Sequence, residues 1–237
     1  MAADSTGWLP GVEQVRTSAW GYPDIAEDGV YPAAVVSHVA QGYMTGLLGI
    51  AQQAAPGKSW HFSIGRDGTI VQHVSIWDPA WHAGDVNAPT WRLHNATNPN
   101  KRTVGIEHEG FSIPPGYSYD YLYSQAAPWP EALIEASIRV HRWVFAQCVS
   151  WLVPSEDTVI THSMLNTRTR AQDPGDLWLA TVRPRIIAAL QVAPPPPTPA
   201  PDEFQRGRRE MFDAWVREEE ANLERVKGLR EEWSIHG

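Results

Sequence analysis

SWHFSIGRDGTIVQHV, residues 59–74, predicts two β-strands joined by a tight turn. Its apolar and β-branched residues fall in two runs, 59–64 and 69–74, on either side of Arg66-Asp67-Gly68. An Asp-Gly pair between two such runs is a strong hairpin signal, because glycine adopts the positive φ that tight hairpin turns need. We therefore expect an antiparallel strand pair at this point of the chain.

Outside the hairpin, strand-like and helix-like segments alternate. Three short apolar or alternating runs predict further strands, at 33–39, 103–109 and 159–162. Three segments with apolar residues at helical spacing predict helices, at 43–53, 131–152 and 179–192. The segment 79–100 is rich in Pro, Asn and Gly, which is typical of a loop that lines a site. The expected fold is α/β, with a mixed central β-sheet flanked by helices.

A proline-rich run divides the chain into a body and a tail. Residues 193–201 read APPPPTPAP, which favours a stiff polyproline II spacer. We expect one domain at 33–192, preceded by an N-terminal extension, 1–32, that packs on it. The charged tail, 202–237, follows the linker.

The tail has the pattern of an amphipathic helix. Its apolar residues recur three and four positions apart, at Phe212, Trp215, Leu223, Val226, Leu229 and Trp233. A single helix cannot bury such a stripe by itself. The tail could dock on the body, pair with a second copy, bind another partner, or remain a solvated charged helix.

Charge and composition exclude several classes of protein. The 237 residues include 19 Lys and Arg against 27 Asp and Glu, a formal net charge of −8, which disfavours nucleic acid as the ligand. No apolar run is long enough to span a membrane, and the first residues lack the pattern of a signal peptide. The single cysteine, Cys148, cannot form an intramolecular disulfide, and we expect it in the core.

Two histidines and one aspartate form a candidate metal site. His38 closes the strand-like run 33–39, and His162 closes the run 159–162, so the two imidazoles could converge on one ion. Asp173 follows in a Gln-Asp-Pro-Gly turn and supplies a third ligand. Each residue alone is more often a hydrogen-bonded structural group. Three ligands together leave the open position that a catalytic metal needs.

The order of the motifs resembles a known family. The motifs are His38, Trp60-His61-Phe62 with Arg66-Asp67-Gly68, Trp81-His82-Ala83-Gly84, Val104-Gly105-Ile106-Glu107, and Thr161-His162-Ser163 through Asp173-Pro174-Gly175. Over roughly 33–190, the chain resembles the zinc-dependent N-acetylmuramoyl-L-alanine amidases of the type 2 amidase and peptidoglycan recognition protein superfamily, particularly those of phage endolysins.

The resemblance implies a zinc hydrolase with one ion per chain. It makes His38, His162 and Asp173 the zinc ligands and Glu107 the general base. Zinc lowers the pKa of water, and a nearby carboxylate can take the proton as the oxygen attacks an amide carbonyl. We expect Glu109, two residues further on, to be structural.

The sequence departs from the family pattern near the third ligand. Ala171 stands where relatives commonly carry a lysine that stabilises the oxyanion, and Arg170 or Arg168 could replace it. Trp60 stands where some relatives have a tyrosine.

The resemblance places Trp60, His61 and His82 at the substrate groove. For the two histidines it implies orienting or substrate-contacting roles, with plain structural hydrogen bonding as the alternative.

The expected substrate is bacterial peptidoglycan, cut between N-acetylmuramic acid and L-alanine. The expected setting is lysis by a phage or prophage endolysin, which accumulates in the host cytoplasm and reaches the wall through a pore made by another protein. A cytosolic amidase that recycles wall fragments and a non-catalytic peptidoglycan-binding module are the alternatives. Self-association through the tail helix stays open.

Overall fold

The computed structural model describes residues 7–17, 32–52, 58–92, 98–111, 129–148 and 152–192. The chain divides into two compact units, residues 1–197 and 198–237. The second unit, and with it the predicted tail helix, lies outside the described residues, as does the linker 193–201.

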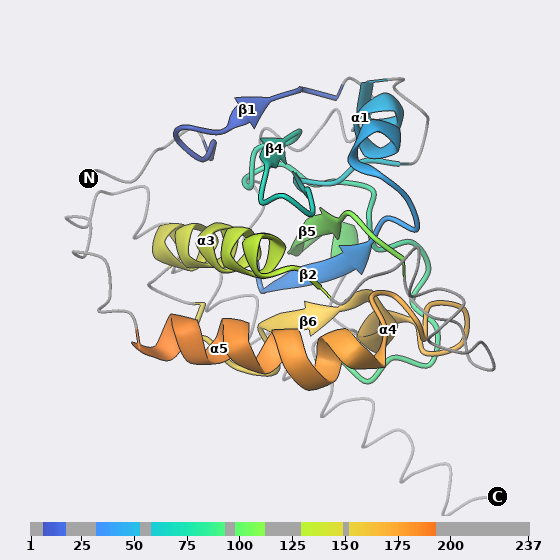
Figure 1. Cartoon of the computed structure of the whole chain (residues 1–237). Coiled ribbons are helices and arrows are strands. Elements are labelled where there is room, and N and C mark those ends of the chain that lie inside the picture. The colour runs from blue at the N-terminus through green and yellow to red at the C-terminus, as the bar shows by residue number, and fades with distance from the viewer. Residues whose placement is uncertain are drawn as a thin grey trace, which may run out of the picture. The chain divides into compact units, whose positions relative to one another are not determined.

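The first unit is a mixed α/β fold, as predicted (Figure 1). Its strands are β1 (Glu13–Gln14), β2 (Ala34–Val39), β3 (Phe62–Ile64), β4 (Ile70–Gln72), β5 (Thr103–His108) and β6 (Val159–Thr161). Its helices are α1 (Met44–Gln52), η1 (Pro99–Lys101), α3 (Glu131–Gln147), α4 (His162–Leu165), the π-helical η2 (Trp178–Val182) and α5 (Arg183–Val192). The strands form one sheet in the order β1-β4-β3-β5-β2-β6, in which only β3 and β4 pair antiparallel.

The β3–β4 pair is the hairpin predicted from the Asp-Gly signal. Gly68 has a φ of +88°, a left-handed conformation that favours glycine. The Asp67 carboxylate accepts a hydrogen bond of 2.9 Å from the Thr69 amide, and the Gly65 amide donates to the Thr69 carbonyl at 2.8 Å. These local bonds close the turn and fix the register of the two strands.

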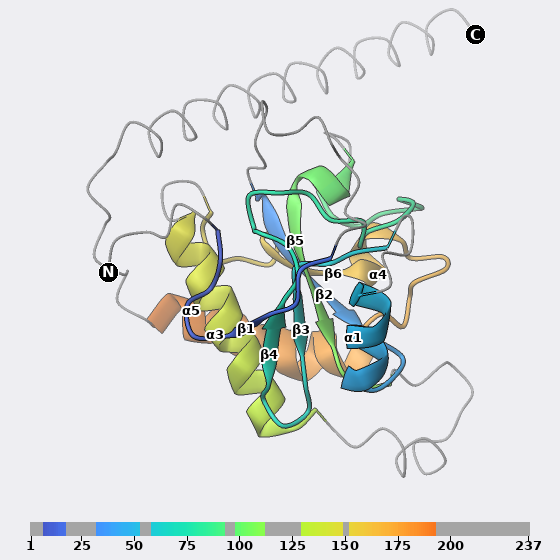
Figure 2. The same ribbon diagram turned by 90° about the horizontal axis from the view of Figure 1, so that it is seen from above.

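Helices cover both faces of the sheet (Figure 2). On one face α3 and α5 pack on a large apolar core that includes Val104 and Ile106 of β5. On the other face α1 packs Leu47 and Ala51 against Trp60. All six residues of β2 are buried, because this interior strand pairs with β5 on one side and β6 on the other and is covered on both faces. Cys148 belongs to the α3 core and is fully buried, as expected.

An edge strand that the sequence pattern did not predict precedes β2. The two residues of β1 pair in parallel with β4. The Gln72 side chain binds the segment that precedes β1. Its oxygen accepts a hydrogen bond from the Leu9 amide at 2.7 Å, and its nitrogen donates to the Gly7 carbonyl at 2.9 Å. Two polar residues carry no apolar alternation, so this strand depends on tertiary pairing alone.

Two boundaries differ from the sequence-based expectation. The helix expected over 131–152 ends at Gln147, where the amide of Cys148 caps it on the carbonyls of Val144 and Phe145. His162 begins α4 immediately after β6 instead of closing that strand. Among the described residues, no helix has the length and apolar character to cross a membrane.

Candidate active site and metal centre

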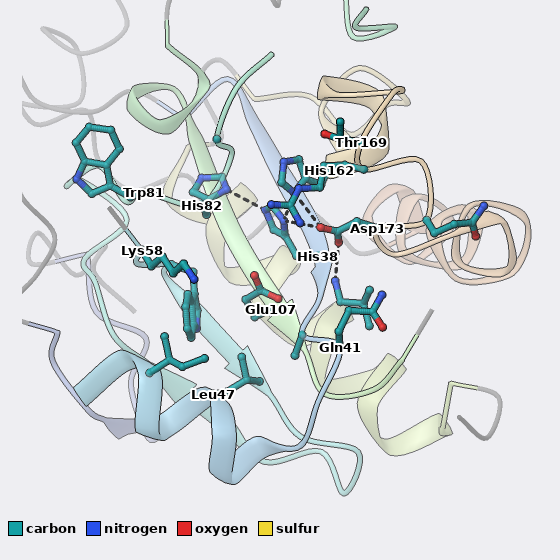
Figure 3. A pocket seen from close by; sticks show the side chains of 17 residues that line it. His38, Gln41, Leu47, Lys58, Trp81, His82, Glu107, His162, Thr169 and Asp173 are labelled. Atoms are coloured by element: carbon teal, nitrogen blue, oxygen red, sulfur yellow. Dashed lines mark hydrogen bonds and ion pairs between the residues drawn. The ribbon is translucent and has the colours of Figure 1, made fainter. Parts of the chain in front are cut away.

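A cleft of about 440 Å³ opens at the carboxyl ends of three parallel strands (Figure 3). Because β2, β5 and β6 run in the same direction, their ends meet at one edge of the sheet. His38 lies near the end of β2, Glu107 near the end of β5, and His162 directly after β6. All three line the cleft, together with Asp173.

The three predicted metal ligands converge at the floor of this cleft. Nδ1 of His38 lies 3.0 Å from Nδ1 of His162, and the Asp173 Oδ2 lies 2.9 Å from the His162 Nδ1 and 3.7 Å from the His38 Nδ1. A tetrahedral zinc ion with bonds of about 2.0–2.1 Å separates its ligand atoms by roughly 3.3 Å. The observed separations bracket that value, so the three atoms fit such an ion.

Hydrogen bonds decide where the protons of His38 lie. Nε2 of His82 faces two acceptors of Thr103, its carbonyl and its hydroxyl, each at 3.2 Å, so this nitrogen carries the proton. Burial lowers the pKa of His82 well below its ordinary value, so the ring is neutral and its Nδ1 is an acceptor. His38 donates to that Nδ1 from Nε2 at 2.9 Å. Burial also lowers the pKa of His38, which leaves its Nδ1 as a lone pair.

The hydrogen bonds of His162 also place its proton on Nε2. Its Nε2 donates to the Ala83 carbonyl at 2.9 Å and therefore bears a proton, while its Nδ1 faces the other two ligand atoms. Burial alone would raise the pKa of Asp173, but the imidazoles of His162 and His38 beside it outweigh burial and hold the pKa below its usual range. Two nitrogens and one carboxylate oxygen thus point at each other, and a cation, either a proton or a metal ion, must lie among them.

The second oxygen of Asp173 is held by the main chain. Oδ1 accepts a hydrogen bond of 2.8 Å from the amide of Val39, the residue that follows His38. This bond connects the turn after α4 to the end of β2. It leaves Oδ2 directed at the two imidazoles.

Glu107 lies beside the triad of candidate ligands, His38, His162 and Asp173, and has an unpaired oxygen. Its Oε2 is buried and has no hydrogen-bond partner in the described part of the chain. Burial raises the pKa of Glu107 well above its ordinary value, and the negative charge of Asp173 raises it further, while Arg170 lowers it. A carboxyl group with a raised pKa and an unpaired oxygen, beside a candidate metal site, is suited to exchange protons with a reacting molecule.

Glu109 has the structural role expected for it. Its Oε1 accepts from the Met44 amide at 3.0 Å, and its Oε2 accepts from the Arg66 amide at 2.7 Å. The carboxylate therefore ties the end of β5 to the start of α1 and to the β3–β4 turn.

Of the two arginines that could replace the family lysine, only Arg170 lines the cleft. Thr169 and Gln172, from the same segment before Asp173, line the cleft as well. Both arginines are exposed, but Arg168 is not among the lining residues. Of the two arginines, Arg170 is therefore the one whose charge lies beside the cleft, where it acts on Glu107.

The three residues predicted to contact substrate have different surroundings. Trp60 lines the cleft and donates from Nε1 to the Ser63 hydroxyl at 2.8 Å. His82 also lines the cleft, but its ring is bonded to His38. His61 corrects the expectation, because it is fully buried and is not part of the lining.

Both nitrogens of His61 are bonded to the main chain. Nε2 donates to the Asp78 carbonyl and Nδ1 accepts from the Gly105 amide, each at 2.9 Å. Both ring nitrogens are thus engaged with the main chain, and neither is directed into the cleft.

Several lining residues were not predicted from the sequence. Trp81 and Lys58 lie on one side of the cleft (Figure 3). Leu47 of α1 also lines the cleft and packs against Trp60. Ile50, also on α1, lines the cleft as well, and Gln41 lies on the opposite side, beside Asp173 (Figure 3). The spacing of apolar residues predicted the helix that became α1, but it could not show which of its residues face a cleft.

The fold and the site are those of an enzyme, and sequence comparison assigns its family. The sequence profile described as N-acetylmuramoyl-L-alanine amidase matches residues 28–176, more than half of the chain. The chain therefore belongs to this amidase family. N-acetylmuramoyl-L-alanine amidase A of Achromobacter lyticus is 29% identical over 158 residues, which cover 60% of this chain and 76% of that protein.

Solved structures share the fold. A crystal structure of a selenomethionine derivative of AmpD superposes with a TM-score of 0.57 at 21% identity, over 79% of this chain and 99% of that chain. A mutant structure of PlyL gives a TM-score of 0.50 at 12% identity, over 77% of this chain and 99% of that chain. At these identities the likeness concerns the fold alone.

Proposed function

We propose that this amidase is zinc-dependent, with His38, His162 and Asp173 as the ligands of one ion per chain. The observation that carries the proposal is the convergence of two imidazole Nδ1 atoms and one carboxylate oxygen within 2.9–3.7 Å. Both imidazoles have their other nitrogen engaged as a donor, so only the converging atoms are free to bind. Two histidines and one carboxylate, with an open cleft above them, are typical of catalytic zinc.

The residues around the ion have separate tasks in this scheme. Zinc, when bound, supplies Lewis acidity that activates water near neutral pH and polarises the amide carbonyl. Glu107 takes a proton from the attacking water at its unpaired Oε2 and returns it to the leaving amine of L-alanine. Arg170 places positive charge on the wall of the cleft, where it can offset the charge that develops on the carbonyl oxygen.

Mass spectrometry of purified peptidoglycan tests this proposal directly. We expect the full chain to release stem peptides that begin with a free L-alanine amine. Treatment with a chelator should abolish their release, and added zinc should restore it. Release that is insensitive to chelation would remove zinc from the scheme, and walls that bind the protein without being cut would make it a binding module.

We infer an endolysin role in lysis by a phage or prophage, with accumulation in the host cytoplasm before release to the wall. The proline-rich linker and the apolar spacing of residues 202–237 support this setting, because an enzyme that recycles small soluble fragments needs no such appendage. Intact walls should therefore be a better substrate than soluble muropeptides.

A chain ending at Val192 separates the possible roles of the tail. In the endolysin role, it should lose activity on intact walls while keeping its activity on soluble muropeptides. A fall in molecular mass by light scattering would indicate self-association through the tail. Equal activity on walls with and without the tail, together with a preference for soluble fragments, would favour the recycling amidase.

A further inference from the structure

One short loop touches both histidine ligands from outside the triad. The imidazole of His82 accepts the Nε2 proton of His38, and the carbonyl of the next residue, Ala83, accepts the Nε2 proton of His162. The two ligands are 124 positions apart in sequence. Their outward nitrogens are nevertheless held by consecutive residues of a single segment.

Asn100 holds the main chain of this loop at His82 and Ala83. Its side-chain oxygen accepts hydrogen bonds from two consecutive amides, from His82 at 2.9 Å and from Ala83 at 2.7 Å. Asn100 is 2% exposed, so both bonds are shielded from water. A second tie lies one residue earlier, where the Ser59 hydroxyl accepts from the Trp81 amide at 2.8 Å.

Gly105 provides the space in which the His82 ring lies. A Cβ atom at this position of β5 would lie 2.4 Å from Cγ and 2.6 Å from Nδ1 of that ring. These distances are far below any van der Waals contact, so a larger residue would displace the imidazole. The Gly105 amide is itself held by Nδ1 of His61. The buried His61 thus has a part in this arrangement, although it lies outside the cleft.

We propose that His82 and Ala83 form an outer clamp that keeps the protons of His38 and His162 on Nε2 and their Nδ1 lone pairs aimed at the metal. Asn100 and Gly105 are the positioning residues that make the clamp possible. The proposal rests on the zinc dependence proposed above and adds residues that do not touch the ion. Without an acceptor at position 82, a proton on Nε2 of His38 would be buried without a partner. The proton would then move to Nδ1, next to Asp173, and block the metal.

The matched variants His82→Leu and His82→Asn test the clamp. Leu and Asn have nearly the same shape, but only Asn retains an acceptor oxygen close to the position of Nδ1. Loss of an outer partner of a ligand typically weakens metal binding by roughly 10–100-fold. We expect that loss of zinc affinity in His82→Leu and most of the wild-type affinity in His82→Asn, measured by competition with a chromophoric chelator.

Nitrogen NMR of the metal-free protein gives a second measurement that is independent of catalysis. In His82→Leu the His38 ring should shift toward the Nδ1-protonated form, while His162, which the Ala83 carbonyl holds, should keep its wild-type pattern. Asn100→Leu releases both halves of the clamp and should alter both rings. Gly105→Ala keeps every polar group but displaces His82, so it should resemble His82→Leu. Thermal melting verifies that each variant is folded.

Two results would overturn the clamp. One is wild-type zinc affinity in both His82→Leu and Gly105→Ala. The other is an unchanged His38 signal in folded His82→Leu. A wild-type chain that binds no zinc at all would instead refute the zinc proposal, so the two failures are distinguishable.

Discussion

His38 and Glu107 are direct partners in the parallel register of β2 and β5. Both lie on the face of the sheet that forms the cleft, whereas Val35 of β2 and Ile106 of β5 pack in the core on the other face. The pairing sets the candidate ligand and the candidate base side by side through main-chain hydrogen bonds alone. The relative position of these two groups therefore depends on the sheet and not on a loop.

Glu107→Gln should retain zinc and lower kcat by about 10²–10⁴-fold, the usual contribution of a general acid or base. The amide has nearly the same shape but cannot take a proton from water. The free energy of unfolding should stay equal or rise, since the buried carboxyl group has an unpaired oxygen. Steady-state kinetics and denaturant unfolding check both points.

Glu109→Gln is the matched control, because Glu109 accepts two main-chain amides outside the triad. It should lower the melting temperature while keeping most of the turnover. Near-normal turnover in Glu107→Gln would assign the base role to another group.

His38→Ala and His162→Ala should each lose stoichiometric zinc, since either change leaves two ligands. His73→Gln is the control, because His73 is bonded to the Ser63 hydroxyl and the Val15 carbonyl, away from the triad. Elemental analysis of the purified proteins measures the metal content directly. A full equivalent of zinc in both alanine variants would mean that the ion binds elsewhere.

Arg170→Ala should reduce kcat by roughly 10²-fold, the lower end of the values for a removed oxyanion donor. Arg170→Lys should recover part of the loss, because the charge is kept while its shape changes. Arg168→Ala should behave like the wild type, since Arg168 does not line the cleft. Comparable losses in the two alanine variants would point to a general electrostatic effect.

Acid should destabilise the metal-free protein below pH 6.5. Burial lowers the pKa of His61 and of His141 to about 4 and that of His108 to about 3, whereas the unfolded chain protonates them near 6.5. The unfolded state therefore binds more protons as the pH falls through this window. Each histidine removes at most about 2 kcal/mol of stability between pH 6.5 and 5.0.

Urea unfolding at several pH values measures this slope. His141 lies on α3, and its Nε2 has no hydrogen-bond partner among the described residues. His141→Phe should therefore reduce the slope of the free energy of unfolding against pH by the contribution of one histidine. An unchanged slope in this variant would show that His141 is protonated in the folded state.

The sequence predicted those parts of the fold that have a local signal. The Asp-Gly turn, the apolar run of β2 and the helical spacing of α3 correspond to elements of the structure. The two residues of β1 were missed because their pairing with β4 leaves no pattern in the sequence. The early end of α3 at Gln147 was missed because apolar residues continue beyond it.

For the site, order along the chain was more informative than residue type. The motif order placed His38, His162 and Asp173 in one group, and the structure brings them together. It could not separate His61 from His82, because both are buried histidines beside the same strand. Their difference lies in which atoms surround them, two main-chain groups for His61 and another imidazole for His82. Such partners are fixed only by the folded chain.

The β1 strand has a practical consequence for shortening this enzyme. The family profile begins at residue 28 and ends at 176, so a chain trimmed to those limits would lack β1, Trp178 and α5. Removal of β1 would open the edge of β4, whose free amides and carbonyls could pair with another molecule. Removal of α5 would take Ile186 out of the core and expose the apolar residues that pack against it. A catalytic fragment for engineering should therefore keep residues 7–192, or its exposed edge and core would favour aggregation.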